Sequence, residues 1–334
     1  MPRVTIALPT VARIAYLREA LESVEAQTFR DFEIVIGDNS ASSEYAALVD
    51  GLAATFSSMD VRIYHHPADL GMIGNARFLV EAARGELWIL LPDDDRLTPD
   101  CLATLVAVLD AEPRAGLAFS DHFVMDAAGK VDLAASDENS ERFGRTLLRA
   151  GFHPNSALFD LALRQVFELQ SMLFRLPVLR ALGFRESAGP IPDFDLQLRL
   201  WKAPMEGVVY CAARLNEYRH HAGQWTVSTD HRGVHRAAIA VLETAAPEDA
   251  LSRPRYRARL AHHYAALANL EAQSGESARA RACARRAIAL DPRAPRAYAA
   301  LCLSHAPPAF VRMARQALHR ARKAVASWWG GTRA

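Results

Sequence analysis

The sequence of 334 residues has few cysteines, no long hydrophobic run and no glycine-rich phosphate loop. Its four cysteines lie far apart without a CxxC pair, which argues against a disulfide framework and a cysteine zinc site. No apolar run approaches the roughly 18 residues that span a bilayer. The opening MPRVTIALPT turns polar too soon for a signal peptide. A globular cytoplasmic protein is therefore expected.

The missing phosphate loops exclude two nucleotide-binding classes. No GxxxxGK[ST] occurs, and GMIGNAR, with Gly71 and Gly74, lacks the GxGxxG spacing of a dinucleotide fingerprint. A phosphate-bearing ligand would therefore be held through a metal ion rather than by a glycine-rich turn.

The net charge of +1 hides an asymmetry between two regions. Residues 251–334 contain 16 Lys and Arg against 3 Asp and Glu, whereas residues 1–250 contain 23 against 35. Together with a change to purely helical patterning, this predicts a domain at 1–230 and a helical annex at 231–334. Because the larger part is net acidic, nucleic acid is not expected as a partner.

The first 125 residues alternate short apolar runs with amphipathic helical patterns. This rhythm predicts an α/β fold with a mostly parallel sheet flanked by helices on both faces. Ligands bind at the carboxyl ends of the strands in such sheets. The expected strands cover 4–8, 32–38, 61–66, 86–91 and 116–125.

Polar residues follow several of these strands. Asp38 and Asn39 follow the second, and Asp93, Asp94 and Asp95 come directly after the apolar run of the fourth. Turn and cap chemistry is one interpretation, with Thr98 as a helix N-cap. Three adjacent carboxylates repel one another unless a cation lies among them. A divalent Mn²⁺ or Mg²⁺ that carries a diphosphate fits this need.

Several stretches, in order over residues 2–230, resemble the family 2 glycosyltransferases, which have the GT-A (Rossmann-like) fold. They include VTIALPT, LREALESVEAQTFRDFEIVIGDNSAS and DLGMIGNARFLVEAARGELWILLPDDDRLTPDCL. The resemblance implies that Asp94 is the metal ligand of a DXD-type motif with Asp95 in support, and that Asp93 faces the ribose. Many members have an acid in place of Pro92. The nucleotide pocket would be formed by Pro9, Thr10, Asp38 and Asn39.

Two later stretches also resemble this family. PDFDLQLRLW is similar to the motif that carries the catalytic base, which makes Asp193 the base and Asp195 the second candidate, with Pro192 in place of a glutamate. Asp193 as a simple helix N-cap is the alternative. YRHHAGQWTVS resembles the closing segment that places His221, with Arg219 beside it, near the diphosphate.

The resemblance implies an inverting transfer of a sugar from a nucleotide-diphosphate sugar to a hydroxyl of a glycan, a lipid-linked glycan or a protein. Residues 136–160 would shape the acceptor site. A sugar-1-phosphate nucleotidyltransferase is an alternative, but LPTVARIAYL lacks the glycine-rich loop that such an enzyme needs. A non-catalytic helical-repeat scaffold with a degenerate transferase domain is the other, because Pro92 and Pro192 depart from the family pattern.

The annex has two features of its own. Residues 256–302 resemble about one and a half tetratricopeptide repeats, fewer than the three that a free solenoid needs. From Phe310 to Trp328 an amphipathic helix is expected with basic residues on its other faces. It could bind an anionic membrane, at the inner face of the plasma membrane, or pack on its own protein.

Overall fold

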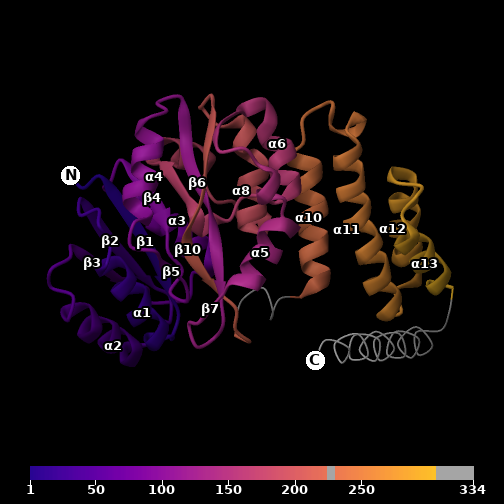
Figure 1. Cartoon of the computed structure of the whole chain (residues 1–334). Coiled ribbons are helices and arrows are strands. Elements are labelled where there is room, and N and C mark those ends of the chain that lie inside the picture. The colour runs from indigo at the N-terminus through magenta and orange to yellow at the C-terminus, as the bar shows by residue number, and fades with distance from the viewer. Residues whose placement is uncertain (224–229, 306–334) are drawn as a thin grey trace, which may run out of the picture. The chain divides into compact units, whose positions relative to one another are not determined.

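The computed structural model of the chain describes residues 1–223 and 230–305. The chain forms two compact units, residues 1–228 and residues 229–334 (Figure 1).

The first unit is built on one mixed sheet of ten strands. Its first four strands in the chain are parallel and lie in the order β3, β2, β1, β4, followed by β9, β6, β10 and β5. The antiparallel strand β9 separates β4 from β6, which again pairs in parallel with β10. The bounds are β1 (Val4–Thr10), β2 (Phe32–Asp38), β3 (Val61–His65), β4 (Leu87–Leu90), β5 (Arg96–Leu97), β6 (Ala115–Met125), β7 (Val131–Asp132), β8 (Gly151–Pro154), β9 (Met172–Arg175) and β10 (Gly207–Arg219).

Helices cover the sheet on both sides. Alternate residues of β1, Val4, Ile6 and Leu8, pack in one core with α1 (Ile14–Glu25), α2 (Ser43–Ala54) and α4 (Cys101–Asp110). The other α-helices in the described part of this unit are α3 (Gly71–Ala82), α5 (Leu133–Arg142), α6 (Asn155–Arg164), α7 (Leu176–Leu182) and α8 (Pro192–Arg199). The predicted fold class, a mostly parallel sheet flanked by helices, is confirmed.

Local sequence explains most helix starts, with one correction. Ser42 caps α2 by accepting a hydrogen bond from the backbone N–H of Tyr45 at 3.2 Å, as serine does at N-caps. Thr98 does not cap α4, which begins at Cys101 with Asp100 in the cap position. Thr98 instead donates its hydroxyl to the carbonyl of Leu215 at 3.1 Å, so tertiary contact replaced the local cap.

The second unit is helical over its described part. Small residues form its contacts, because Ala265, Ala287 and Ala297 make one cluster and a parallel set, Ala268, Ala284 and Ala300, makes another. Small side chains let helices approach closely but bury little apolar area each. Its helices are α10 (His231–Ala245), α11 (Pro254–Gln273), α12 (Ser277–Leu290) and α13 (Pro295–Leu303).

Among the helices of residues 1–223 and 230–305, none is long and apolar enough to cross a bilayer. The basic amphipathic helix predicted from Phe310 to Trp328 lies outside the described residues.

Candidate active site

The carboxyl ends of β1 and β2 bring the first predicted residues together. Thr10 is the register partner of Asp38, and Pro9 is the partner of Gly37. The backbone N–H of Asn39 donates to the carbonyl oxygen of Thr10 at 3.0 Å. Pro9, Thr10, Asp38 and Asn39 therefore share one edge of the sheet, as parallel pairing requires.

Asp93, just beyond β4, is tied to the same edge. Its side chain is fully buried, and the hydroxyl of Thr10 donates to its Oδ2 at 2.7 Å. The guanidinium of Arg13 pairs with its Oδ1. Burial raises the pKa of Asp93 to about 6, against the opposing effect of Arg13. The carboxylate thus depends on its hydrogen bonds and on one arginine for its charge.

Asp94 is the most accessible of the three aspartates. Its side chain is 13% exposed, and its Oδ2 lies 2.9 Å from Nη1 of Arg13 and 3.0 Å from Nε2 of His221. His221 follows the end of β10, so the contact joins residues 127 positions apart. Two nitrogen groups therefore converge on one carboxylate oxygen at the mouth of the site.

Asp95 faces inward. Its Oδ1 accepts the backbone N–H of Arg219 at 2.9 Å, and burial followed by the charge of Asp94 raises its pKa well above the usual range. The side chain of Arg219 donates to the carbonyl of Asp94 at 2.7 Å and to Glu19 at 2.6 Å. Arg219 therefore holds the loop after β4 in place.

The side chains of Asp38 and Asn39 are also engaged. Asp38 is 1% exposed; its Oδ1 accepts the N–H of Ser40 at 3.0 Å and its Oδ2 lies 2.8 Å from Nδ1 of His65. The Oδ1 of Asn39 accepts the N–H of Leu70 at 2.8 Å. These contacts shape the loops after β2 and β3 around the edge.

Arg13 and Tyr45 were not among the predicted site residues. The phenol oxygen of Tyr45 accepts the N–H of Arg13 at 3.0 Å and lies 2.7 Å from the hydroxyl of Thr10. The repulsion among adjacent aspartates signalled that a cation was needed, and Arg13 stands three residues after Thr10. That signal could have identified Arg13 as well as a metal.

Asp193 belongs to another part of the unit. It is the only exposed residue of α8, although the surrounding protein desolvates its carboxyl enough to raise its pKa. No hydrogen bond or ion pair within the described ranges joins it to Asp93, Asp94 or His221. Its charge acts instead on Glu168.

Asp195, the second candidate for the base, is a structural residue. It is 2% exposed and accepts a hydrogen bond from Nε of Arg199 at 2.8 Å. The same guanidinium donates to the carbonyls of Leu182 and Gly183, at the end of α7. This buried clamp fixes α8 and leaves Asp193 as the exposed acid at its start.

Glu168 was not among the predicted site residues, and its carboxyl feels the charge of Asp193. Its Oε1 is 3.9 Å from Nη1 of Arg145. Burial, and then the charges of Asp193 and Asp121, raise the pKa of Glu168 to about 7, against the effect of Arg145. No motif marks this glutamate, because its neighbours come from distant parts of the sequence.

No group of three or more His, Cys, Asp or Glu side chains in the described residues is arranged to hold a metal ion. The carboxylate of Asp94, which is partly exposed, is the oxygen donor that a hard divalent cation prefers. Such ions commonly take one or two carboxylates and complete their coordination with water and substrate phosphate. The donor set therefore fits a cation shared with a ligand.

Comparison with solved structures shows the fold. One similar solved structure is TarS of S. aureus with UDP-GlcNAc, at 12% identity and a TM-score of 0.60 over 94% of this chain and 92% of that one. Another is the mannosyltransferase PcManGT from Pyrobaculum calidifontis with GDP-Man and Mn²⁺. It is 17% identical, with a TM-score of 0.57 over 98% of this chain and 83% of that one. At these identities the likeness shows the fold alone, which is the GT-A fold.

The sequence comparisons name the family. Residues 5–156 match glycosyl transferase family 2. A relative from Campylobacter jejuni, GalNAc(5)-diNAcBac-PP-undecaprenol beta-1,3-glucosyltransferase, is 29% identical over 32% of this chain and 34% of its own length. The chain spans between 16% and 69% of the curated relatives that it matches. The chain therefore contains a glycosyl transferase family 2 domain with the GT-A fold and is a glycosyltransferase.

Proposed function

We propose that the protein transfers a sugar, with inversion, from a nucleotide-diphosphate sugar to a hydroxyl of a glycan, a lipid-linked glycan or a protein. The observation that carries this proposal is the contact network at the sheet edge. Thr10 donates to Asp93 at 2.7 Å, and Arg13 pairs with both Asp93 and Asp94. His221 lies 3.0 Å from Asp94, so segments far apart in the chain meet at this edge. The relatives that bind UDP-GlcNAc and GDP-Man support a donor of this class.

The donor would lie along the carboxyl edge of β1, β2 and β4. In this proposal Pro9, Thr10, Asp38 and Asn39 shape the nucleoside pocket. Asp93 faces the ribose, and His221 is near the diphosphate. Because the side chains of Asp38 and Asn39 are already bonded within the protein, we infer that they act mainly by fixing the loops that bound the pocket.

Asp94 would hold the metal ion, Mn²⁺ or Mg²⁺, with Asp95 as its buried support. The metal would neutralise charge on the departing diphosphate. Arg13 and His221 contact the same oxygen of Asp94, so these nitrogens rearrange when a cation takes that oxygen. The solved relative with GDP-Man and Mn²⁺ supports a divalent ion.

Asp193 would act as the general base that removes the acceptor proton. A useful base has a pKa closer to neutrality than an exposed aspartate. Desolvation raises the pKa of Asp193 in that direction. The hydrogen bonds from Arg199 to the carbonyls of Leu182 and Gly183 hold α8 in place. A general base needs such a fixed position in order to meet the acceptor hydroxyl.

Calorimetric titration with UDP, GDP and dTDP, each with and without Mn²⁺, tests the donor site. At least one nucleotide is expected to bind, and Mn²⁺ is expected to tighten that binding at least tenfold. Asp94→Asn is expected to remove the Mn²⁺ effect, whereas Glu186→Gln, an exposed carboxylate elsewhere in the same unit, leaves it unchanged. Absence of binding by all three nucleotides would contradict the proposed donor class.

A further inference from the structure

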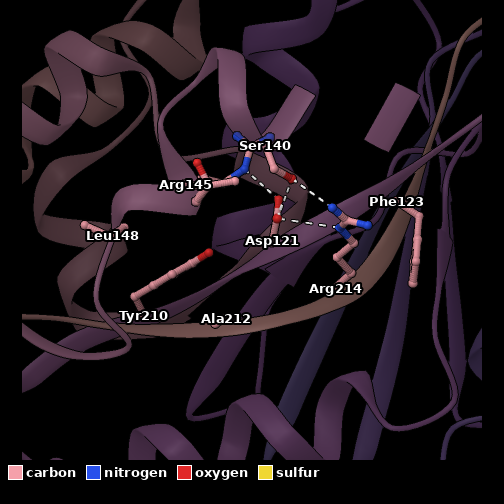
Figure 2. Close-up of a pocket in the computed structure, with 9 residues that line it drawn as sticks. Asp121, Phe123, Ser140, Arg145, Leu148, Tyr210, Ala212 and Arg214 are labelled. Atoms are coloured by element: carbon pink, nitrogen blue, oxygen red, sulfur yellow. Dashed lines mark hydrogen bonds and ion pairs between the residues drawn. The ribbon is translucent and has the colours of Figure 1, made fainter. Parts of the chain in front are cut away.

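A second polar cluster of the first unit surrounds a cavity of about 450 Å³ (Figure 2). Its walls come from β6, from α5 and the turn that follows it, and from β10. The volume falls within the range of about 300–1,000 Å³ typical of ligand pockets. Ser140 and Arg145 come from the segment 136–160, which the sequence predicted to shape the acceptor site. The proposed donor residues do not line it.

Asp121 lines this cavity, and both of its carboxylate oxygens already have partners within the protein. Its Oδ1 accepts hydrogen bonds from Nε of Arg145 at 2.6 Å and from the backbone N–H of His122 at 2.9 Å. Its Oδ2 accepts the hydroxyl of Ser140 at 2.5 Å and lies 3.6 Å from Nε of Arg214. Asp121 therefore organises the wall and has little capacity left for a ligand.

The two arginines of this wall are already paired with acids. Arg145 and Arg214 are offset by Asp121 and by Asp137, whose Oδ1 lies 2.6 Å from Nη2 of Arg214. Such a wall gives neither an anion nor a cation a strong electrostatic advantage. The cavity thus suits a polar ligand without net charge.

Tyr210 supplies the free polar group. It is only 3% exposed, and its ring packs against Phe119 with centroids 4.9 Å apart. Its hydroxyl points into the cavity toward Asp121 in Figure 2, and no hydrogen bond to it occurs within the described residues. Burial raises the pKa of Tyr210 to about 12, so the hydroxyl stays protonated. The hydroxyl faces the cavity and is therefore available to pair with a ligand or with water.

Part of the remaining wall is apolar. Phe123 and Leu148 line the cavity, and the guanidinium of Arg214 lies over the ring of Phe123 at 5.6 Å. A ligand that suits these walls has hydroxyl groups for Tyr210 and Arg214 and C–H surfaces for the aromatic and leucine side chains. A sugar ring combines these properties.

We propose that this cavity binds a neutral sugar unit of the acceptor. The inference rests on the proposed function, since it names the acceptor as a carbohydrate. It also places one sugar of that acceptor on the side of the protein where the proposed base, Asp193, lies. The link to that side is Arg145, which contacts Asp121 at one end and lies 3.9 Å from Glu168 at the other. Glu168 in turn lies within the electrostatic reach of Asp193.

Two adjacent alanines of β10 provide a matched test. Ala212 and Ala213 are both exposed, but only Ala212 lines the cavity. Ala212→Trp would fill the cavity, and Ala213→Trp is the control with the same change in size. Tyr210→Phe removes only the hydroxyl and keeps the buried ring.

Binding of the full chain to labelled trisaccharides is measured directly. The neutral probes contain glucose, mannose or N-acetylglucosamine, and the charged probes are a uronic acid trisaccharide and inorganic phosphate. At least one neutral probe is expected to bind. Ala212→Trp is expected to weaken it at least tenfold, Tyr210→Phe threefold to tenfold, and Ala213→Trp less than twofold.

Three outcomes would overturn the inference: no neutral probe binds, only the charged probes bind, or the two tryptophan variants bind alike. Nucleotide titration of the same variants separates this test from that of the donor site. Unchanged nucleotide binding by Ala212→Trp shows that the variant is folded. If no nucleotide binds but Ala212→Trp still blocks the trisaccharide, the donor proposal fails and the carbohydrate site stands.

Discussion

Two groups of acids in the first unit differ in how their charges are balanced. Asp93 and Asp94 both pair with Arg13, and Asp94 also meets His221. On the other side, Glu168 has one long contact of 3.9 Å with Arg145, and no Arg, Lys or His of the described residues forms an ion pair with Asp193. Acids that pair with protein cations can exchange those partners for a bound metal ion. Desolvated acids without a close cation are instead suited to accept a proton.

The largest effect is expected on catalysis. Asp193→Asn is expected to lower sugar transfer by about 10²–10⁴-fold, because a general base contributes that much, while nucleotide binding stays at the wild-type level. Asp94→Asn is expected to lower both. Transfer assays and calorimetry on the two variants measure the difference. Equal loss of nucleotide binding in both would erase the distinction between the two groups, and normal turnover by Asp193→Asn would remove Asp193 as the base.

Removing Arg199 or Arg13 compares how much each arginine stabilises the buried aspartate that it pairs with. Arg199→Met leaves the carboxylate of Asp195 buried without its cation, and a loss of about 3–5 kcal/mol in the free energy of unfolding is expected. Arg13→Met is expected to cost about 1–3 kcal/mol, because Thr10 still donates to Asp93. Denaturant unfolding of both variants measures this. A larger loss for Arg13→Met would reverse the expected order.

The raised pKa of Glu168 predicts that the free energy of unfolding depends on pH. Its pKa is raised to about 7 in the folded protein by burial and by Asp193 and Asp121, against Arg145. A raised pKa stabilises the fold at low pH, and this contribution is lost as the pH rises toward 7. The wild type is therefore expected to lose on the order of 1–2 kcal/mol more than Glu168→Gln between pH 4.5 and 7. Parallel curves of unfolding free energy against pH for the two proteins would refute this assignment.

The smallest effect is expected at Tyr45. Tyr45→Phe removes the phenol that accepts the N–H of Arg13 and bonds Thr10, at a cost of about 1 kcal/mol. Thermal unfolding measures this, with Tyr64→Phe as the control, since the hydroxyl of Tyr64 accepts a hydrogen bond from Arg62 rather than from Arg13. A shift in nucleotide affinity larger than the shift in stability would show that Tyr45 also orients the donor.

Much of the sheet edge proposed to hold the donor could be predicted from sequence because its parts are local. Asp38 ends one buried strand and Asp93 comes three residues after another, and parallel pairing brings such positions to one edge. The region proposed to meet the acceptor was harder to predict. PDFDLQLRLW located α8, but the choice between Asp193 and Asp195 depended on Arg199, four residues on, and on the carbonyls that end α7.

The sequence by itself determined the alternation of strands and helices, the edge where polar residues gather and the need for a cation among Asp93, Asp94 and Asp95. These follow from periodicity and from charge repulsion between neighbours, both of which are local. Only the tertiary structure decided which cations meet these acids, because Arg13 and His221 lie 81 and 127 positions from Asp94. The cavity around Asp121 also depends on tertiary structure, since β6, α5 and β10 form its walls only when the sheet and its helices pack together.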